Sequence, residues 1–312
     1  MELFRDVNID WLSKKWIALG FSLVFSIAGI CSMLFWHGIP EGVDFKGGTQ
    51  VRVSFAGPLN EDHIRAAMDS AGIRDTRIQR ITDEKKNEAV ITLPINSETG
   101  HSNPREVVKN ALATHYTDSA ATIEDAYTVG PTAGKQLRSQ AGWAVFWSLV
   151  GMLVFLWVRF EFIYGAAAVI AVFHDTLITV GFFSLFNKEI TLTVIAALLT
   201  LVGYSMNDTI VVFDRIRENL QINRRANLAD VVNRSINQTL SRTVLTSGLT
   251  FLTVLSLYLF GGEVLHGFSF ALVVGILIGT YSSIAVAAPM LVAYQDWRAK
   301  RGKGATLPAK RG

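Results

Sequence analysis

Residues 162–186 read FIYGAAAVIAVFHDTLITVGFFSLF, an apolar run in which the only acidic or basic residues are His174 and Asp175. A membrane-spanning helix needs about 20 mainly apolar residues, because each residue rises about 1.5 Å and the hydrocarbon layer is about 30 Å thick. This run is long enough to cross a bilayer once. It therefore predicts a membrane protein rather than a soluble domain.

Five further stretches approach or meet the same requirement on either side of this run. The expected spans are Trp16–Trp36, Ala141–Val158, Phe162–Phe186, Ile190–Phe213, Thr243–Phe260 and Phe268–Ala293. Hydrophobic residues make up 50% of the 312 residues and charged residues only 18%, with a mean hydropathy of +0.33. We expect a polytopic α-helical membrane protein with six transmembrane helices.

The first span is preceded by Lys14 and Lys15 and could be a cleaved signal peptide. However, it ends in the bulky side chains of Leu34, Phe35 and Trp36 rather than in a small-residue cleavage site. We therefore expect an uncleaved membrane anchor.

Basic residues are distributed unevenly between the two sides of these spans. The segments expected in the cytoplasm carry Arg5, Lys14, Lys15, Arg159, Arg215, Arg217, Arg224, Arg225, Arg234, Arg242, Arg298, Lys300, Arg301, Lys303, Lys310 and Arg311. The short outer loops hold only Lys188. This asymmetry predicts cytoplasmic termini and accounts for the net charge of +3 without nucleic acid. A role for the arginines of residues 215–242 in binding anionic lipid or ribosomal RNA stays open.

Residues 37–138, between the first two spans, have ordinary polarity and predict an outer domain. Strands are expected at Thr49–Phe55, Arg77–Ile81, Ala89–Ile95 and Ala121–Val129. One helix is expected after Asn60, ending at Gly72, and a second from Pro104. The order βαββαβ is that of a ferredoxin-like α+β domain.

The chain therefore divides into four parts. Residues 1–36 form the N-terminus and first helix, 37–138 the outer domain, 139–297 helices two to six with a cytoplasmic segment at about 214–242, and 298–312 a basic tail. The single cysteine, Cys31, lies in an apolar run, so neither a disulfide framework nor a metal site is expected. No cofactor motif or nucleophile–base pair is visible, so we expect no catalytic residues and no enzyme activity.

Ionisable residues in a membrane helix are functional candidates, because a carboxylate there costs at least about 2.5 kcal/mol. His174 and Asp175 lie near the middle of the third span, and Asn207 and Asp208 toward the inner end of the fourth. Each carboxylate could instead be a satisfied structural group that ties helices together. His174 and Asp175 could also orient each other or contact a partner protein.

Arg242, at the expected start of the fifth helix, is a candidate partner of Asp208. Asp208 should lie roughly 9 Å inside the cytoplasmic boundary, within reach of a long arginine side chain if the two helices are neighbours. A plain positive-inside anchor is the alternative role for Arg242. Opposing effects of burial and a nearby cation could make the couple responsive to protons.

Two glycine-containing stretches mark the boundaries of the outer domain: residues 42–49, GVDFKGGT, and residues 129–134, VGPTAG. Their glycines could permit tight turns or absorb backbone rotation. Neither stretch has the spacing of a phosphate-binding loop. The junction residues of interest are Asp44, Phe45, Gly47, Gly48, Gly130, Pro131 and Gly134.

Together with residues 202–219, VGYSMNDTIVVFDRIREN, and 235–243, SINQTLSRT, these stretches resemble signature segments of the SecF family. The fourth-helix stretch, which includes Gly203, Asp214 and Arg215, is the specific one. The resemblance covers nearly the whole chain, from the first helix to the sixth.

The resemblance implies an RND-type half, with six helices and one periplasmic domain, in the bacterial inner membrane. It implies a SecD partner, cooperation with SecYEG and YajC, and contact with translocating unfolded chains. Such a complex uses the proton-motive force to assist late protein translocation. Two alternatives stay open: an RND-type small-molecule efflux permease, and an assembly factor of the translocon that transports nothing.

Overall fold

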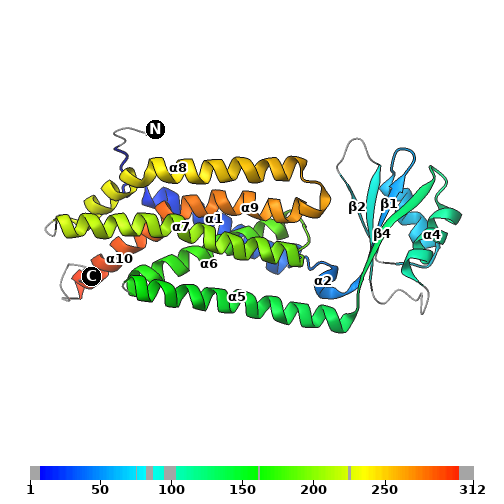
Figure 1. Ribbon diagram of the computed structural model, residues 1–312, viewed down its shortest axis with the longest axis horizontal. Helices are drawn as coiled ribbons and strands as arrows, with labels where there is room; N and C mark the ends of the chain where they lie inside the picture. The colour runs from blue at the N-terminus through cyan, green and yellow to red at the C-terminus, as the bar shows by residue number, and fades with distance from the viewer. Residues whose placement is uncertain are drawn as a thin grey trace.

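The computed structural model describes residues 8–74, 76–81, 87–94, 103–160, 162–223 and 226–301. It consists of an elongated helix bundle with a small α+β domain at one end, and both ends of the described chain lie at the opposite end (Figure 1). Several residues considered above fall outside these ranges: Arg5, Ile95, Arg224, Arg225 and the tail from residue 302 onward.

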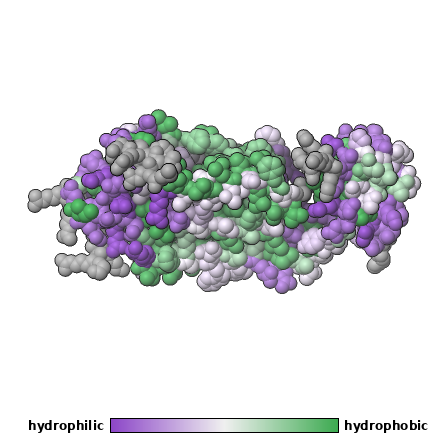
Figure 2. Space-filling view, turned by 45° about the horizontal axis from the view of Figure 1, so that its top comes forward, coloured by the Kyte–Doolittle hydropathy of each residue, from purple (hydrophilic) through white to green (hydrophobic). Residues whose placement is uncertain are grey.

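Six helical segments are long and apolar enough to cross a membrane, in agreement with the predicted number. The bundle comprises α1 Lys15–Cys31 with its π-helical continuation η1 Ser32–Trp36, α5 Pro131–Arg159, α6 Phe162–Leu185, α7 Leu192–Ile222, α8 Leu228–Phe260, α9 Glu263–Ser282, η2 Ser283–Ala287 and α10 Ala288–Lys300. The last three form one continuous span. Figure 2 shows an apolar belt around the middle of the bundle, with hydrophilic surfaces toward both ends. This distribution is typical of a membrane-embedded bundle.

Three helices begin or end well outside their predicted bounds. Helix α5 starts at Pro131 rather than Ala141, α7 continues past Phe213 to Ile222, and α8 starts at Leu228 rather than Thr243. Hydropathy detects only the apolar part of a helix, whereas capping extends it: the Asn227 side chain accepts a hydrogen bond from the Ala229 amide. Arg242 therefore lies inside α8 and not at its start.

The sixth span is also longer than predicted, reaching from Glu263 to Lys300 instead of Phe268 to Ala293. At the domain boundary, residues 131–138 belong to α5 rather than to the outer domain.

Small residues let the bundle helices approach closely. A Cβ atom added to Gly181 of α6 would lie 2.7 Å from the Gly29 Cα of α1. A Cβ atom added to Gly275 of α9 would lie 2.5 Å from the Leu201 side chain of α7, and one added to Gly279 would lie 3.0 Å from the Ser205 Cβ of α7. Close packing of this kind holds helices together where lipid removes the hydrophobic driving force.

The α+β domain follows the predicted element order. Its elements are β1 Gly48–Phe55, α3 Glu61–Ser70, β2 Arg77–Arg80, β3 Glu88–Leu93, α4 Pro104–His115 and β4 Ala121–Val129. The sheet has the order β2-β3-β1-β4, and every neighbouring pair is antiparallel. A short helix that the sequence did not indicate, α2 Val43–Lys46, lies between the bundle and the sheet (Figure 1).

The core of this domain lies between one face of the sheet and the two helices. Val51, Val53 and Phe55 alternate along β1 and pack with Ile64 of α3 and Val108 of α4. Asn60 caps α3 by accepting hydrogen bonds from the amides of Asp62 and His63, as its position predicted. The domain therefore has its own core, separate from that of the bundle.

Candidate functional site

Asp175 of α6 is completely buried at the centre of a polar cluster in the bundle. Its Oδ2 accepts hydrogen bonds from Ser205 Oγ of α7 at 2.5 Å and from Ser282 Oγ of α9 at 2.7 Å. Its Oδ1 lies 3.0 Å from His174 Nδ1, and His174 Nε2 contacts the Ser22 hydroxyl of α1. Four helices thus contribute to one hydrogen-bonded cluster around a buried carboxyl group.

The structure brings His174 and Asp175 together, one of the two possibilities that the sequence left open. The sequence analysis missed Ser22, Ser205 and Ser282. Each is a serine within an apolar helix, and nothing in its local pattern shows which helix it faces. Their convergence depends on the close approach of α9 to α7 at Gly279.

Asp208 of α7 forms a second buried site, with a side chain only 2% exposed. Its Oδ2 accepts a hydrogen bond from Ser247 Oγ of α8 at 2.7 Å. Arg242 is exposed on α8, and no ion pair joins it to Asp208 within the described part of the chain. Ser247, rather than Arg242, is therefore the direct partner.

The two carboxylate sites are linked through α7. Ser205 bonds Asp175, and Asp208 follows three residues later, roughly 4.5 Å further along the helix. The Thr209 hydroxyl also donates to the Ser205 carbonyl oxygen at 3.2 Å. A displacement of α7 would therefore affect both carboxylates.

Asn207 lies apart from both sites. Adjacent residues in a helix point about 100° apart, and Asn207 is exposed while Asp208 is buried. It shares its outward face with Thr193, Ala196, Thr200 and Gly203.

The charged residues beyond the membrane part of α7 form surface ion pairs. Asp214 accepts from Arg159 of α5 at 3.2 Å, and Arg215 pairs with Glu218 at 3.0 Å. Pairs this exposed contribute little to stability. The Arg159–Asp214 pair does connect α7 to the end of α5.

At the other end of α7, Asp44 joins the bundle to the α+β domain. Its Oδ2 accepts a hydrogen bond from the Leu192 amide at the start of α7 at 2.9 Å, and its Oδ1 accepts one from the Tyr127 hydroxyl of β4 at 3.3 Å. The neighbouring Phe45 is buried in the apolar cluster of the bundle that includes Phe183. A carboxylate at a helix N-terminus is favoured by the helix dipole.

The junction glycines are closely packed. Gly47 and Gly48 have φ angles of 75° and 135°, and a Cβ on Gly48 would lie 2.5 Å from the Leu93 carbonyl oxygen. Gly134, in the first turn of α5, would place a Cβ 2.9 Å from the Phe45 carbonyl oxygen. Gly130, just before Pro131, has an ordinary φ of −71° and open space around it. This geometry favours turn and packing roles for Gly47, Gly48 and Gly134.

A partly buried ion pair, not anticipated from the sequence, docks the sheet on the bundle. Arg77 of β2 lies 3.1 Å from Glu189 in the loop between α6 and α7, and Arg77 also donates to the Asn187 carbonyl oxygen at 2.5 Å. The Glu189 side chain is only 10% exposed. Burial raises the pKa of the Glu189 carboxyl group, while the positive charges of Arg77 and Lys46 oppose this shift.

Within the described residues, no cluster of three or more His, Cys, Asp or Glu side chains could hold a metal ion. The polar groups instead form two carboxylate–hydroxyl sites inside the bundle and one charged contact at the domain junction. Such an arrangement can bind and release protons and can transmit movement along α7.

Comparison with known proteins gives consistent matches. The family described as "Protein export membrane protein SecD/SecF, C-terminal" matches residues 107–297. The chain is 50% identical to the protein translocase subunit SecF of Koribacter versatilis, over 98% of this chain and 96% of that protein.

Two solved structures of SecDF resemble it. The translocon-associated SecDF from Thermus has a TM-score of 0.84 and 36% identity, covering 93% of this chain. SecDF in a super-membrane-facing form has a TM-score of 0.70 and 36% identity, covering 96% of this chain. This chain spans 39% and 40%, respectively, of those longer chains.

The contact between Arg77 and Glu189 predicts how the Glu189 carboxyl group titrates when the docking contact is removed. Arg77→Ala removes a cation that holds the pKa of Glu189 down, so we expect that pKa to rise further. The ion pair needs ionised Glu189, so it is present above the raised pKa and lost as the pH falls through it. Isotope-edited infrared titration of the Glu189 carboxyl group, with Arg77→Ala compared against wild type, measures the shift.

Arg80→Ala is the matched control, because Arg80 lies in the same strand but donates to the Leu59 carbonyl oxygen. An unchanged Glu189 titration in Arg77→Ala would show that the pair does not control this carboxyl group.

Proposed function

Because this chain belongs to the SecF family of protein translocase subunits, we propose that it couples the proton-motive force to late protein translocation together with a SecD partner. The observation that carries the proposal is the pair of buried carboxylates, Asp175 and Asp208, linked through α7. A carboxylate inside a membrane costs at least about 2.5 kcal/mol, a cost that is hard to explain by structure alone. The proposed role is that of a transporter subunit and not of an enzyme.

Protonation of Asp208 is the proposed driving event. Ionised Asp208 attracts Arg242 and accepts the Ser247 hydrogen bond. Once it is neutral, the attraction to Arg242 is lost and the contact between α7 and α8 weakens. Protonation of Asp208 therefore shifts α7 from one position to another, because the ionised and the neutral carboxyl group favour different positions of the helix.

Movement of α7 has a direct route to the outer domain. Asp208 lies sixteen residues from Leu192, or about 24 Å along the helix, and the Leu192 amide is bonded to Asp44, which also contacts β4. Residues Asp44 to Gly48 therefore form the transmission point. A translocating unfolded chain would be the load that this domain moves.

We propose that the α+β domain, which has the ferredoxin-like order, lies in the periplasm and that both termini are cytoplasmic. The supporting observation is the position of the basic residues. The bundle end away from the domain carries Arg159, Arg215, Arg217, Arg234, Arg298 and Lys300, as the positive-inside rule requires of a cytoplasmic side. The protein would thus be a multi-pass component of the bacterial inner membrane.

The proposed docking surface for the SecD partner lies on α7 and α8. The outward face of α7 carries small and polar residues, Thr193, Ala196, Thr200, Gly203 and Asn207, and that of α8 carries Arg242, Thr246, Thr253 and Ser256. Faces of this kind favour helix–helix contact in membranes. They also place the partner beside Asp208, where it could contribute to the proton path. We also propose that the protein contacts SecYEG and YajC through surfaces other than this one.

The alternatives make different demands. An efflux permease is less well supported, because the identity with SecF relatives extends over nearly the whole chain. An assembly factor that transports nothing would need the carboxylates only for packing. Neutralising Asp208 without altering its shape separates this role from energy coupling.

Orientation is tested with topology reporters. Fusions after Trp36 and within residues 60–120 should report an external location, and fusions at both termini a cytoplasmic one. A cytoplasmic signal from residues 60–120 would overturn the proposed orientation.

The partner surface is tested with a bulky substitution. Gly203→Trp should prevent close helix contact and reduce copurification of SecD several-fold. Gly151→Trp on α5 is the matched control, because a Cβ at either glycine meets no atom within 4 Å. Equal SecD recovery with both variants would place the interface elsewhere.

Energy coupling is tested with Asp208→Asn, measured as export into inner-membrane vesicles with and without an imposed proton gradient. We expect the gradient-dependent part of export to be lost, because the amide cannot ionise, while SecD copurification stays normal. Arg242→Ala should impair export less severely, since Ser247 remains the direct partner. Asp214→Asn, an exposed carboxylate on the same helix, is the control. Normal gradient-dependent export by Asp208→Asn would exclude Asp208 as the proton carrier and leave Asp175 to be tested in the same way.

A further inference from the structure

An apolar cavity of about 700 Å³ opens between α1, α8 and α9 at the bundle end away from the α+β domain. Its volume falls within the range of about 300–1,000 Å³ that is usual for ligand sites. Phe21, Phe251, Ile276, Leu277 and Ile284 form much of its apolar wall. Neither Asp175 nor Asp208 lines this wall, although Ser247, which donates to Asp208, does.

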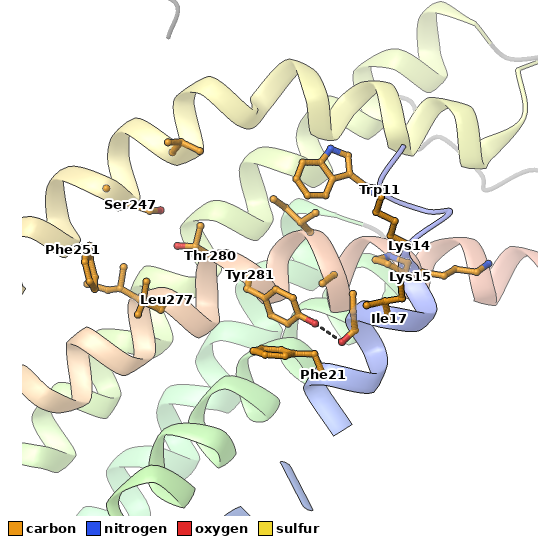
Figure 3. A pocket seen from close by; sticks show the side chains of 17 residues that line it. Trp11, Lys14, Lys15, Ile17, Phe21, Ser247, Phe251, Leu277, Thr280 and Tyr281 are labelled. Atoms are coloured by element: carbon orange, nitrogen blue, oxygen red, sulfur yellow. Dashed lines mark hydrogen bonds between the residues drawn. The ribbon is translucent and has the colours of Figure 1, made fainter. Parts of the chain in front are cut away.

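The cavity has a cationic end and an apolar end. Figure 3 shows Trp11, Lys14 and Lys15 at one end and Phe251 and Leu277 at the other. The cationic end coincides with the start of α1, whose first turn holds no acidic residue and no side-chain cap. The two lysines attract an anion, and a tryptophan suits the membrane–water interface. One carboxylate, that of Asp10, lies nearby and accepts hydrogen bonds from the Ser13 amide and the Asn233 side chain.

The surrounding contacts hold this cationic end in place. The Trp11 amide and indole nitrogens donate to Asn233 and Asn237 of α8 at 2.9 and 3.1 Å, respectively. The Tyr281 hydroxyl of α9 donates to the Ala18 carbonyl oxygen of α1 (Figure 3). The Trp11 bonds hold the segment before α1 against α8, and the Tyr281 bond holds the first turn of α1 against α9. The separation of the cavity walls is therefore built into the fold.

We propose that this cavity binds an anionic phospholipid, with its phosphate at Lys14 and Lys15 and one acyl chain along the wall of α8 and α9. The charge distribution matches this ligand class: a basic end at the membrane surface and an apolar channel leading inward. Ile17 and Leu277 are 77% and 53% exposed, so the cavity is open to lipid at its side. The lipid would lie in the cytoplasmic leaflet, an assignment that rests on the proposed orientation.

An acyl chain here would also cover one side of the Asp208 site. Ser247 lines the cavity and donates to Asp208. An occupied cavity excludes water from this side, so protons would reach Asp208 from the side of α7 instead. The bound lipid would therefore control whether water reaches Asp208 from the side of the cavity.

The test uses the full chain copurified with SecD from membranes that contain equal amounts of phosphatidylglycerol and phosphatidylcholine. Lipids retained in detergent are identified by native mass spectrometry. We expect retained lipid to be enriched in phosphatidylglycerol, by about fivefold for each lysine at the site. The double variant Lys14→Ala/Lys15→Ala should lose this preference and still retain lipid.

Gly248→Leu tests the acyl channel separately. Gly248 lines the cavity and a Cβ there meets no atom within 4 Å, so the new side chain starts in open space beside the cavity. Retention of both lipids should be lost. Gly151→Leu is the control, since Gly151 has the same open surroundings on α5 and does not line the cavity.

Should Gly248→Leu fail to assemble with SecD, Leu277→Trp, at an exposed position on the cavity wall, narrows the same channel. Unchanged lipid retention in the cavity-filling variants, or an unchanged headgroup preference in the lysine variant, would each overturn the proposal. None of these readouts depends on export, so their failure is distinct from failure of the coupling mechanism.

Discussion

The low polarity of the bundle interior is the constraint on which the rest of the structure depends. A buried carboxylate must find hydrogen-bond donors within the protein or lose its charge. Asp175 has Ser205, Ser282 and His174 as partners, and Asp208 has Ser247. Each serine donor lies on a different helix from the carboxylate to which it donates, so satisfying the carboxylates and assembling the bundle are one requirement.

Serine hydroxyls are short, and they reach a carboxylate only if helix backbones are close. Glycine provides that closeness at the contacts of Gly181 with Gly29 and of Gly279 with Ser205. A methyl group at Gly181 would force α1 and α6 apart, an overpacking that costs about 1–3 kcal/mol in a packed core. The small residues thus determine where the polar groups meet, although they have no chemistry of their own.

Helix α7 connects the domain junction with the buried carboxylates because polar contacts hold both its first turn and its middle. Its N-terminus is bonded to Asp44, and its middle carries Ser205 and Asp208. The nearby loop contributes Glu189, which pairs with Arg77 of the sheet. The proposed coupling through a rigid helix with partners in both regions needs no flexible hinge, in keeping with the close packing of Gly48 and Gly134.

The sequence by itself determined the six apolar spans, the order of elements in the α+β domain, and the identity of Asp175 and Asp208 as unusual residues. These features are local: they depend on runs of apolar side chains, on alternation within a strand, and on a charge standing in an apolar context. The helix ends beyond the apolar runs were missed, because capping and not hydropathy sets them. The partners of the carboxylates were decided only by tertiary structure. Ser247 rather than Arg242 bonds Asp208, and Arg77 meets Glu189 across more than one hundred residues, because the facing of helices depends on packing that no local pattern records.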